Sequence, residues 1–143
     1  METNLCVAGF GGQGVMTLGK FLADATCNST DKNVTFFPSY GAEQRGGTAN
    51  CYVVISDDAI GAPLGDVMDD LIVMNGPSLA KFLPKLKQNG TLFINSSIVK
   101  GEIDRADVDV VKAPVTELAL EMGNAKVLNV IMLGVYVGYT EVI

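Results

Sequence analysis

Short apolar runs alternate with stretches of helical periodicity along this chain. The first run, residues 5–8, ends in the glycine-rich segment 9–14, and apolar side chains then recur every three or four positions from Val15 to Ala25. A short apolar run bounded by glycine is typical of a buried strand, and spacings of three and four are typical of an amphipathic helix. The pattern therefore predicts a strand, a tight turn and a helix at the start of the chain.

The same alternation continues through the remaining sequence. Further strands are predicted at residues 34–37, 50–56, 71–74, 91–95 and 108–112. Helices are predicted at residues 78–88, although Pro84 lies inside this segment, and at residues 116–122 and 126–136, separated by Gly123. Alternating strands and helices favour an α/β fold that is Rossmann-like and three-layered, with a mainly parallel sheet covered by helices on both faces.

Length and composition narrow the class of protein. The 143 residues suit a single domain, expected to cover residues 1–143. With 48% hydrophobic and 18% charged residues, the composition excludes disorder, and the apolar runs are too short to span a bilayer. No export signal is visible at the start, so a cytoplasmic protein is expected. The net charge of −6 argues against a nucleic-acid partner.

The inventory of reactive side chains is small. Histidine is absent, which removes the commonest general base and a common zinc ligand. Cys6, Cys27 and Cys51 form no CxxC pair and are interpreted as buried structural residues. The acidic pairs at 57–58 and 69–70 are interpreted as solvated turn carboxylates. We therefore expect no metal site and no catalytic residue in this chain. Four methionines are expected to fill the core: Met68, Met74, Met122 and Met132.

The segment 9–14 fits the pattern G-x-G-x-x-G between a predicted strand and a predicted helix. Glycines there allow backbone N–H groups to approach a phosphate, which the N-terminus of the helix also favours. The alternative is that the glycines only allow the helix to pack closely on the sheet. A dinucleotide site would also need an acidic residue at the end of the second strand, and the nearest one, Glu43, lies in the following loop.

A second segment, residues 38–48, follows the second predicted strand. We expect this connection at the carboxyl end of a parallel strand, where open α/β sheets bind ligands. Arg45 offers a planar donor group suited to phosphate or carboxylate, and Gly46 and Gly47 allow close backbone contacts. The alternative is an ion pair between Glu43 and Arg45 that only fixes the loop.

Together, the stretches GFGGQGV and SYGAEQRGGTANCYVVISD closely resemble the gamma subunit, or fused gamma domain, of 2-oxoacid:ferredoxin oxidoreductases. Residues 70–75, 90–97 and 126–134 are also similar to that family, so the resemblance covers nearly the whole chain. The form SYG-x-E-x-RGG is more similar to the 2-oxoglutarate and branched-chain 2-oxoacid members than to the pyruvate members. Family members commonly continue beyond residues 136–143, so a chain truncated at Ile143 and a naturally short variant both remain open.

The resemblance implies a role in an enzyme of anaerobic metabolism that converts a 2-oxoacid and coenzyme A into acyl-CoA and carbon dioxide, with electrons passing to ferredoxin. Thiamine diphosphate, magnesium and iron–sulfur clusters are expected only in partner subunits, namely alpha, beta and possibly delta. This chain is expected to be inactive alone, to bind coenzyme A and to contact those subunits.

The predicted coenzyme A site joins both glycine-bearing segments. It comprises Gly11, Gly12, Gln13, Gly14, Ser39, Tyr40, Glu43, Arg45, Gly46 and Gly47. Two alternatives remain: a structural module that assembles the complex without binding a small molecule, and an independent nucleotide-binding Rossmann protein. The site requires that residues 9–14 lie near residue 45.

Overall fold

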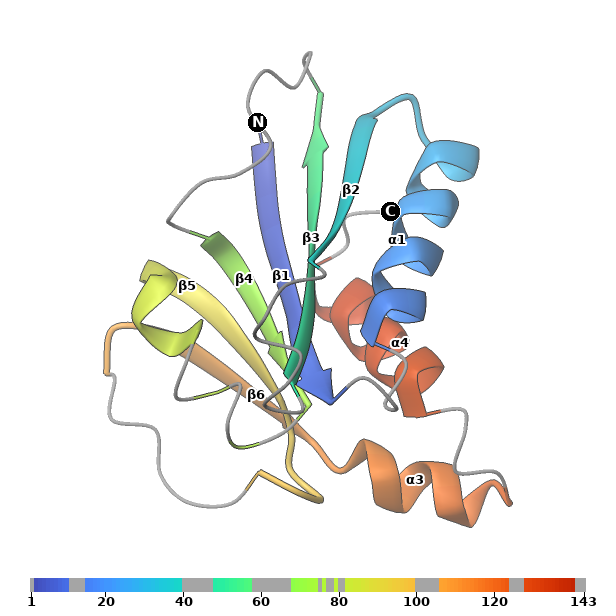
Figure 1. The fold of residues 1–143 in the computed structure, drawn as a ribbon, viewed down its shortest axis with the longest axis vertical. Coiled ribbons are helices and arrows are strands. Elements are labelled where there is room, and N and C mark those ends of the chain that lie inside the picture. Colours follow the sequence, from blue (N-terminus) through green and yellow to red (C-terminus); the bar gives the residue numbers. More distant parts are fainter. Residues whose placement is uncertain are drawn as a thin grey trace.

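The computed structural model describes residues 2–10, 15–39, 48–57, 68–74, 76, 79, 82–99, 106–123 and 128–140. These ranges combine six strands in one sheet with helices packed on it, which confirms the predicted α/β class (Figure 1). The strands are β1 (Glu2–Phe10), β2 (Asn33–Ser39), β3 (Thr48–Ser56), β4 (Met68–Val73), β5 (Leu86–Asn95) and β6 (Asp109–Ala113). The helices are α1 (Val15–Ser29), the 3-10 helix η3 (Leu83–Lys85), α3 (Val115–Glu121) and α4 (Leu128–Thr140).

Within the described ranges, the strands form one six-stranded sheet of order β2-β3-β1-β4-β5-β6. The pairs β1–β4, β4–β5 and β5–β6 are parallel, as predicted. Strand β3 is antiparallel to both of its neighbours, β1 and β2, so the sheet is mixed. The connection 40–47 therefore joins two adjacent antiparallel strands, although β2 itself runs in the same direction as β1.

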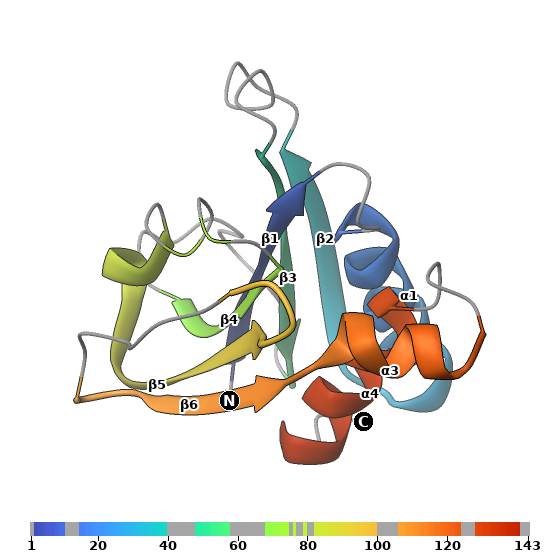
Figure 2. The ribbon, with the colours of Figure 1, turned by 90° about the horizontal axis from the view of Figure 1, so that it is seen from below.

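Both faces of the sheet are buried, and the side chains of consecutive residues in a strand point to opposite faces. Leu5 and Val7 of β1 belong to one apolar cluster, whereas Cys6 and Ala8 belong to the other. This burial on both sides explains why the strands appear in the sequence as continuous apolar runs. Helices α1 and α4 cover the first face, and the turn containing η3 covers the second (Figure 2).

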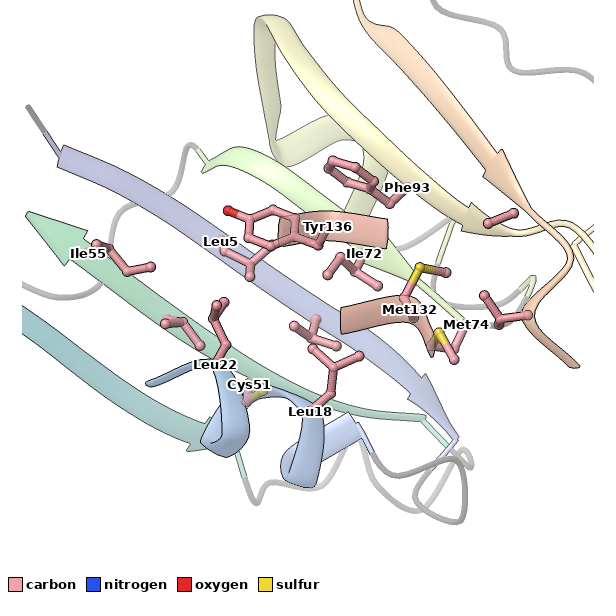
Figure 3. Close-up of a cluster of buried hydrophobic side chains, with 14 residues drawn as sticks. Leu5, Leu18, Leu22, Cys51, Ile55, Ile72, Met74, Phe93, Met132 and Tyr136 are labelled. Atoms are coloured by element: carbon pink, nitrogen blue, oxygen red, sulfur yellow. The ribbon is translucent and has the colours of Figure 1, made fainter. Parts of the chain in front are cut away.

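The cluster beneath α1 and α4 is the larger of the two. Leu18 and Leu22 of α1 and Met132 of α4 point toward the sheet and belong to the same cluster as Ile72 of β4 and Phe93 of β5 (Figure 3). Each fully buried side chain of this size contributes about 1.5–3 kcal/mol. The predicted core role of Met68, Met74 and Met132 is confirmed, but Met122 at the end of α3 is 71% exposed, so that prediction is wrong.

The predicted helix 78–88 is wrong at its C-terminal end. Strand β5 already begins at Leu86, directly after η3, and Pro84 lies within that short 3-10 turn. The apolar residues of the predicted helix, Leu79, Phe82 and Leu83, nevertheless pack on the second cluster, as expected for an amphipathic segment. The register between β4 and β5 shifts near Asn89, whose φ of 67° lies in the left-handed region. Asparagine tolerates that region better than most residues do.

The C-terminal end of α3 lies where the sequence predicted a helix to end, at Gly123. Gly123 has φ 83° directly after the C-cap, the left-handed conformation that commonly ends a helix. Across the ranges given above, no helix is long and apolar enough to cross a bilayer.

Candidate functional site

The backbone flanking the two glycine-bearing segments converges at one edge of the sheet. Phe10, the last residue of β1, is the register partner of Thr48, the first residue of β3. Asn50 of β3 pairs with Ala8 on one side and with Ser39 on the other. Segment 11–14 follows Phe10, and segment 40–47 lies between Ser39 and Thr48. Both segments therefore leave the sheet from the same edge.

Most residues of the predicted site lie in these two segments. Ser39 is described as the last residue of β2. The other predicted residues fall outside the described ranges: Gly11, Gly12, Gln13, Gly14, Tyr40, Glu43, Arg45, Gly46 and Gly47. The flanking residues Phe10, Ser39 and Thr48 lie close together, but the distance between residues 9–14 and residue 45 falls outside the described ranges, so the site stays a prediction.

The N-terminus of α1 lies at the same edge. This 15-residue helix begins at Val15 and carries no acidic residue in its first turn. The first amides of a helix lack partners inside the helix, and the helix dipole favours negative charge at that end. The described part of the site therefore suits an anion such as a phosphate group.

The sheet order points to the same place. After β1 the chain forms β2 and β3 on one side of it, and β4, β5 and β6 on the other. Ligands of open α/β sheets bind outside the carboxyl ends of the strands at such a reversal of strand order. The backbone N–H of Met74 donates to the carbonyl of Ala8 at 2.8 Å, which extends the contact between β1 and the chain after β4 toward this edge.

The order of strands also bears on the dinucleotide hypothesis. In a dinucleotide-binding fold the second strand lies beside the first, so that its terminal acidic residue reaches the ribose. Here β3 separates β2 from β1, and β2 ends at Ser39 without an acid. The geometry therefore argues further against a nicotinamide dinucleotide.

Gly19 is a buried residue of α1 that the sequence interpretation missed. A Cβ atom placed there would lie 2.5 Å from Sγ of Cys51 and 3.0 Å from Cε1 of Phe36. The helix therefore approaches β3 and β2 more closely than a side chain at this position allows. The available signal was a glycine on the apolar face of a predicted helix, next to Leu18 and Leu22.

The cysteines differ in exposure. Cys6 and Cys51 are buried, as predicted, but Cys27 is exposed near the end of α1, so its prediction is wrong. Burial raises the pKa of the Cys51 thiol to about 12. The thiol is therefore protonated at neutral pH, which favours a packing role over a reactive one.

The acidic pair at 69–70 lies inside β4, so its interpretation as turn carboxylates is wrong. The Tyr136 hydroxyl donates to Oδ2 of Asp70 at 2.8 Å, and burial raises the pKa of this carboxyl. Asp69 accepts from the backbone N–H of Asn4 at 2.7 Å and forms an ion pair with Lys87. These contacts lie toward the amino end of β4, away from the candidate site.

Within the described ranges, no three residues among cysteine, aspartate and glutamate gather in a way that suits a metal ion. The donors that this part of the chain offers at the candidate edge are backbone amides, which suit phosphate rather than a cation.

A six-stranded α/β sheet in which a helix begins shortly after the carboxyl end of β1 is the arrangement of a Rossmann-like domain. Residues 4–143 match the family described as Pyruvate ferredoxin/flavodoxin oxidoreductase, and the chain belongs to that family. The predicted family is thereby confirmed.

The likeness to a single relative supports the same family. The chain is 39% identical over 134 residues to the ketoisovalerate oxidoreductase subunit VorA of Methanothermobacter thermautotrophicus, a match that covers 94% of this chain and 28% of VorA. The chain thus spans less than a third of that relative.

Two solved structures share the fold. The gamma subunit of a keto/oxoacid ferredoxin oxidoreductase from Geobacter sulfurreducens has a TM-score of 0.89 at 25% identity, covering 100% of this chain and 78% of that subunit. The 2-oxoglutarate:ferredoxin oxidoreductase of Magnetococcus marinus, solved with 2-oxoglutarate, coenzyme A and succinyl-CoA, has a TM-score of 0.77 at 26% identity, covering 90% of this chain and 22% of that chain.

Proposed function

We propose that this chain is the gamma-type part of a 2-oxoacid:ferredoxin oxidoreductase that oxidises 2-oxoglutarate or 2-oxoisovalerate to an acyl-CoA and carbon dioxide, with electrons passing to ferredoxin. The family match, the likeness to VorA and the likeness to a solved gamma subunit support this proposal. This reaction is the activity of a whole complex, to which the chain contributes one cytoplasmic domain, residues 1–143.

The role proposed for this chain is to hold coenzyme A by its phosphate groups. The observation that carries it is the common origin of segments 11–14 and 40–47 at one sheet edge, beside the N-terminus of α1. Backbone amides of Gly11, Gly12, Gln13 and Gly14 and the guanidinium of Arg45 are the proposed phosphate donors. The Magnetococcus marinus enzyme, solved with coenzyme A, supports the choice of ligand.

Holding the phosphates restricts where the coenzyme A thiol can lie, which favours its reaction with an acyl group in a partner subunit. The carbanion and electron-transfer chemistry would come from thiamine diphosphate, magnesium and iron–sulfur clusters in those partners. The proposed partners are the alpha and beta subunits, with a delta subunit in some complexes. Ferredoxin is an indirect partner, reached through these subunits. A structural module that binds no coenzyme A is the second candidate, since the same edge could contact another subunit.

Substitution of Arg45 separates the two candidates. In the assembled complex, Arg45→Ala should raise the KM for coenzyme A about tenfold to a hundredfold, because a hydrogen bond to a charged group contributes about 1.5–3 kcal/mol. Steady-state kinetics with varied coenzyme A measure this effect. Lys85→Ala is the matched control, because it also removes one positive charge but lies in η3, directly before the amino end of β5. An unchanged KM in an intact complex would favour the structural module.

A further inference from the structure

Gly19 is buried at a position where a side chain has no room. It lies on the face of α1 that packs against β3, where an added Cβ would be 2.5 Å from Sγ of Cys51. Contacts of 3.4–4 Å are ordinary for a Cβ atom, so α1 would have to move away from the sheet by about 1 Å, or the sulfur would have to shift. Phe36 limits movement on the side of β2, because its Cε1 atom is 3.0 Å from the same point.

Helix α4 shows that a glycine inside a helix of this protein need not be so tightly packed. Gly134 and Gly138 also lie inside a helix, yet an added Cβ at either position would meet nothing within 4 Å. Glycine is a poorer helix former than alanine, so a glycine inside a helix is disfavoured unless packing requires it. At Gly19 the packing against Cys51 supplies that requirement.

The place of Gly19 in the fold connects this contact to the candidate site. Gly19 lies one helical turn after Val15, the first residue of α1. Cys51 lies three positions after Thr48, the register partner of Phe10. The contact between Gly19 and Cys51 therefore holds α1 against β3 one turn after its first residue, close to the sheet edge at which β1 ends. Any shift of α1 away from Cys51 also moves the first-turn amides relative to the sheet edge.

We propose that Gly19 and Cys51 are positioning residues, whose close contact sets the height of the first turn of α1 above the sheet and thereby the geometry with which its amides meet a phosphate group of coenzyme A. This inference rests on the proposed function. A displacement of about 1 Å in a binding site can change rates by as much as a hundredfold, so a contact of this kind affects ligand use without touching the ligand.

Four variants of the assembled complex test the contact. Gly19→Ala should raise the KM for coenzyme A at least about tenfold while kcat changes by less than about threefold, because the defect lies in phosphate binding. The double variant Gly19→Ala with Cys51→Ala should return the KM to within about threefold of the unmodified value, because the sulfur that blocks the new methyl group is gone and only the ring of Phe36, at 3.0 Å, still has to shift slightly. Cys51→Ala alone should change the KM less than Gly19→Ala does. Gly134→Ala is the control and should have the KM of the unmodified complex.

A purely structural role would lower the unfolding temperature of Gly19→Ala without the selective rise in KM and its rescue. An unchanged KM for Gly19→Ala, together with a raised KM for Arg45→Ala, would overturn this inference and leave the proposed function standing. Unchanged values for both variants would overturn the two together. If Gly19→Ala alone does not fold, the double variant decides: a folded protein with the unmodified KM supports the contact, and failure to regain either property overturns it.

Discussion

Asp70 and Tyr136 form a buried pair that ties α4 to the middle of the sheet. Tyr136 is fully buried, donates to Asp70 at 2.8 Å and packs edge-on against the ring of Phe93, with centroids 5.1 Å apart. Sequence alone does not reveal this pair, because its members are 66 positions apart. The adjacent acidic residues resemble a solvated turn, and only the start of β4 at Met68 places Asp70 inside the core.

Loss of the Tyr136 hydroxyl should destabilise the fold. Tyr136→Phe keeps the ring contact but leaves the Asp70 carboxyl without its donor, which costs about 1–3 kcal/mol for a buried polar group. Urea denaturation of the variant at neutral pH measures the change in the free energy of unfolding. Tyr139→Phe is the matched control, because Tyr139 also packs on Phe93 but is 51% exposed. Equal stability of the two variants would show that the hydroxyl contact to Asp70 contributes little.

The same pair predicts a dependence of stability on pH. Burial raises the pKa of Asp70 above its ordinary value of 3.8, so the folded state holds this proton more tightly than the unfolded state does. The contribution of Asp70 to stability is therefore fully present below about pH 3.8 and is lost as the pH rises through the folded pKa. Asp70→Asn removes that loss.

The free energy of unfolding of Asp70→Asn, measured across pH 4–7 and compared with that of the unmodified chain, tests this sign. The advantage of the variant should grow as the pH rises. A difference that stays constant with pH, or that shrinks toward neutrality, would show that the pKa of Asp70 is not raised in the folded protein.

At the scale of single elements, the sequence predicted each strand well but misjudged the segment before β5. Two-sided burial produces the apolar runs that reveal β1, β4 and β5. The spacing of Leu79, Phe82 and Leu83 correctly indicated an apolar face, but not where the helical segment ends. Asn89 and Gly90, which directly follow the predicted helix 78–88, have the residue types of a helix end, but they lie within β5, where the backbone carbonyls of Asp69 and Lys87 leave no room for a Cβ at Gly90. A turn signal does not distinguish a helix end from an irregular strand.

The exposure of helical residues was also only partly predictable. Met122 and Cys27 have the residue types of a core, yet both are exposed, because Met122 lies directly after the last residue of α3 and Cys27 lies on the outer side of α1, next to the buried Thr26. Gly19 shows the converse: a glycine on the apolar face of a helix is a weak signal, and only its distance to Cys51 of another element gives it a role. Contacts between elements decide both cases, and a pattern within one element does not contain them.

At the scale of the whole molecule, the order and direction of strands were the least predictable features. A run such as residues 50–56 has the same composition in a parallel and in an antiparallel strand. The eight residues between Ser39 and Thr48 did hold a signal, because a parallel neighbour needs a crossover of about a dozen residues or more. The resulting position of β3 between β2 and β1 keeps both candidate segments at one edge. Their own ligand contacts stay a prediction.

That strand order leads to a prediction about ligand choice. A dinucleotide site needs an acid at the end of a second strand beside β1, and here β3 occupies that place. The N-terminus of α1 needs only an anion, so the phosphates of coenzyme A can bind without such an acid. The isolated chain should therefore show saturable heat in calorimetric titration with coenzyme A, and none with NAD at the same concentrations.

The Arg45→Ala chain is the control for this titration and should bind coenzyme A more weakly. Saturable binding of NAD without binding of coenzyme A would contradict the argument from strand order and favour an independent nucleotide-binding protein. Binding of neither ligand by the folded chain, with normal use of coenzyme A by the assembled complex, would mean that the partner subunits complete the phosphate site. The edge formed by β1, β3 and α1 would then supply only part of that site.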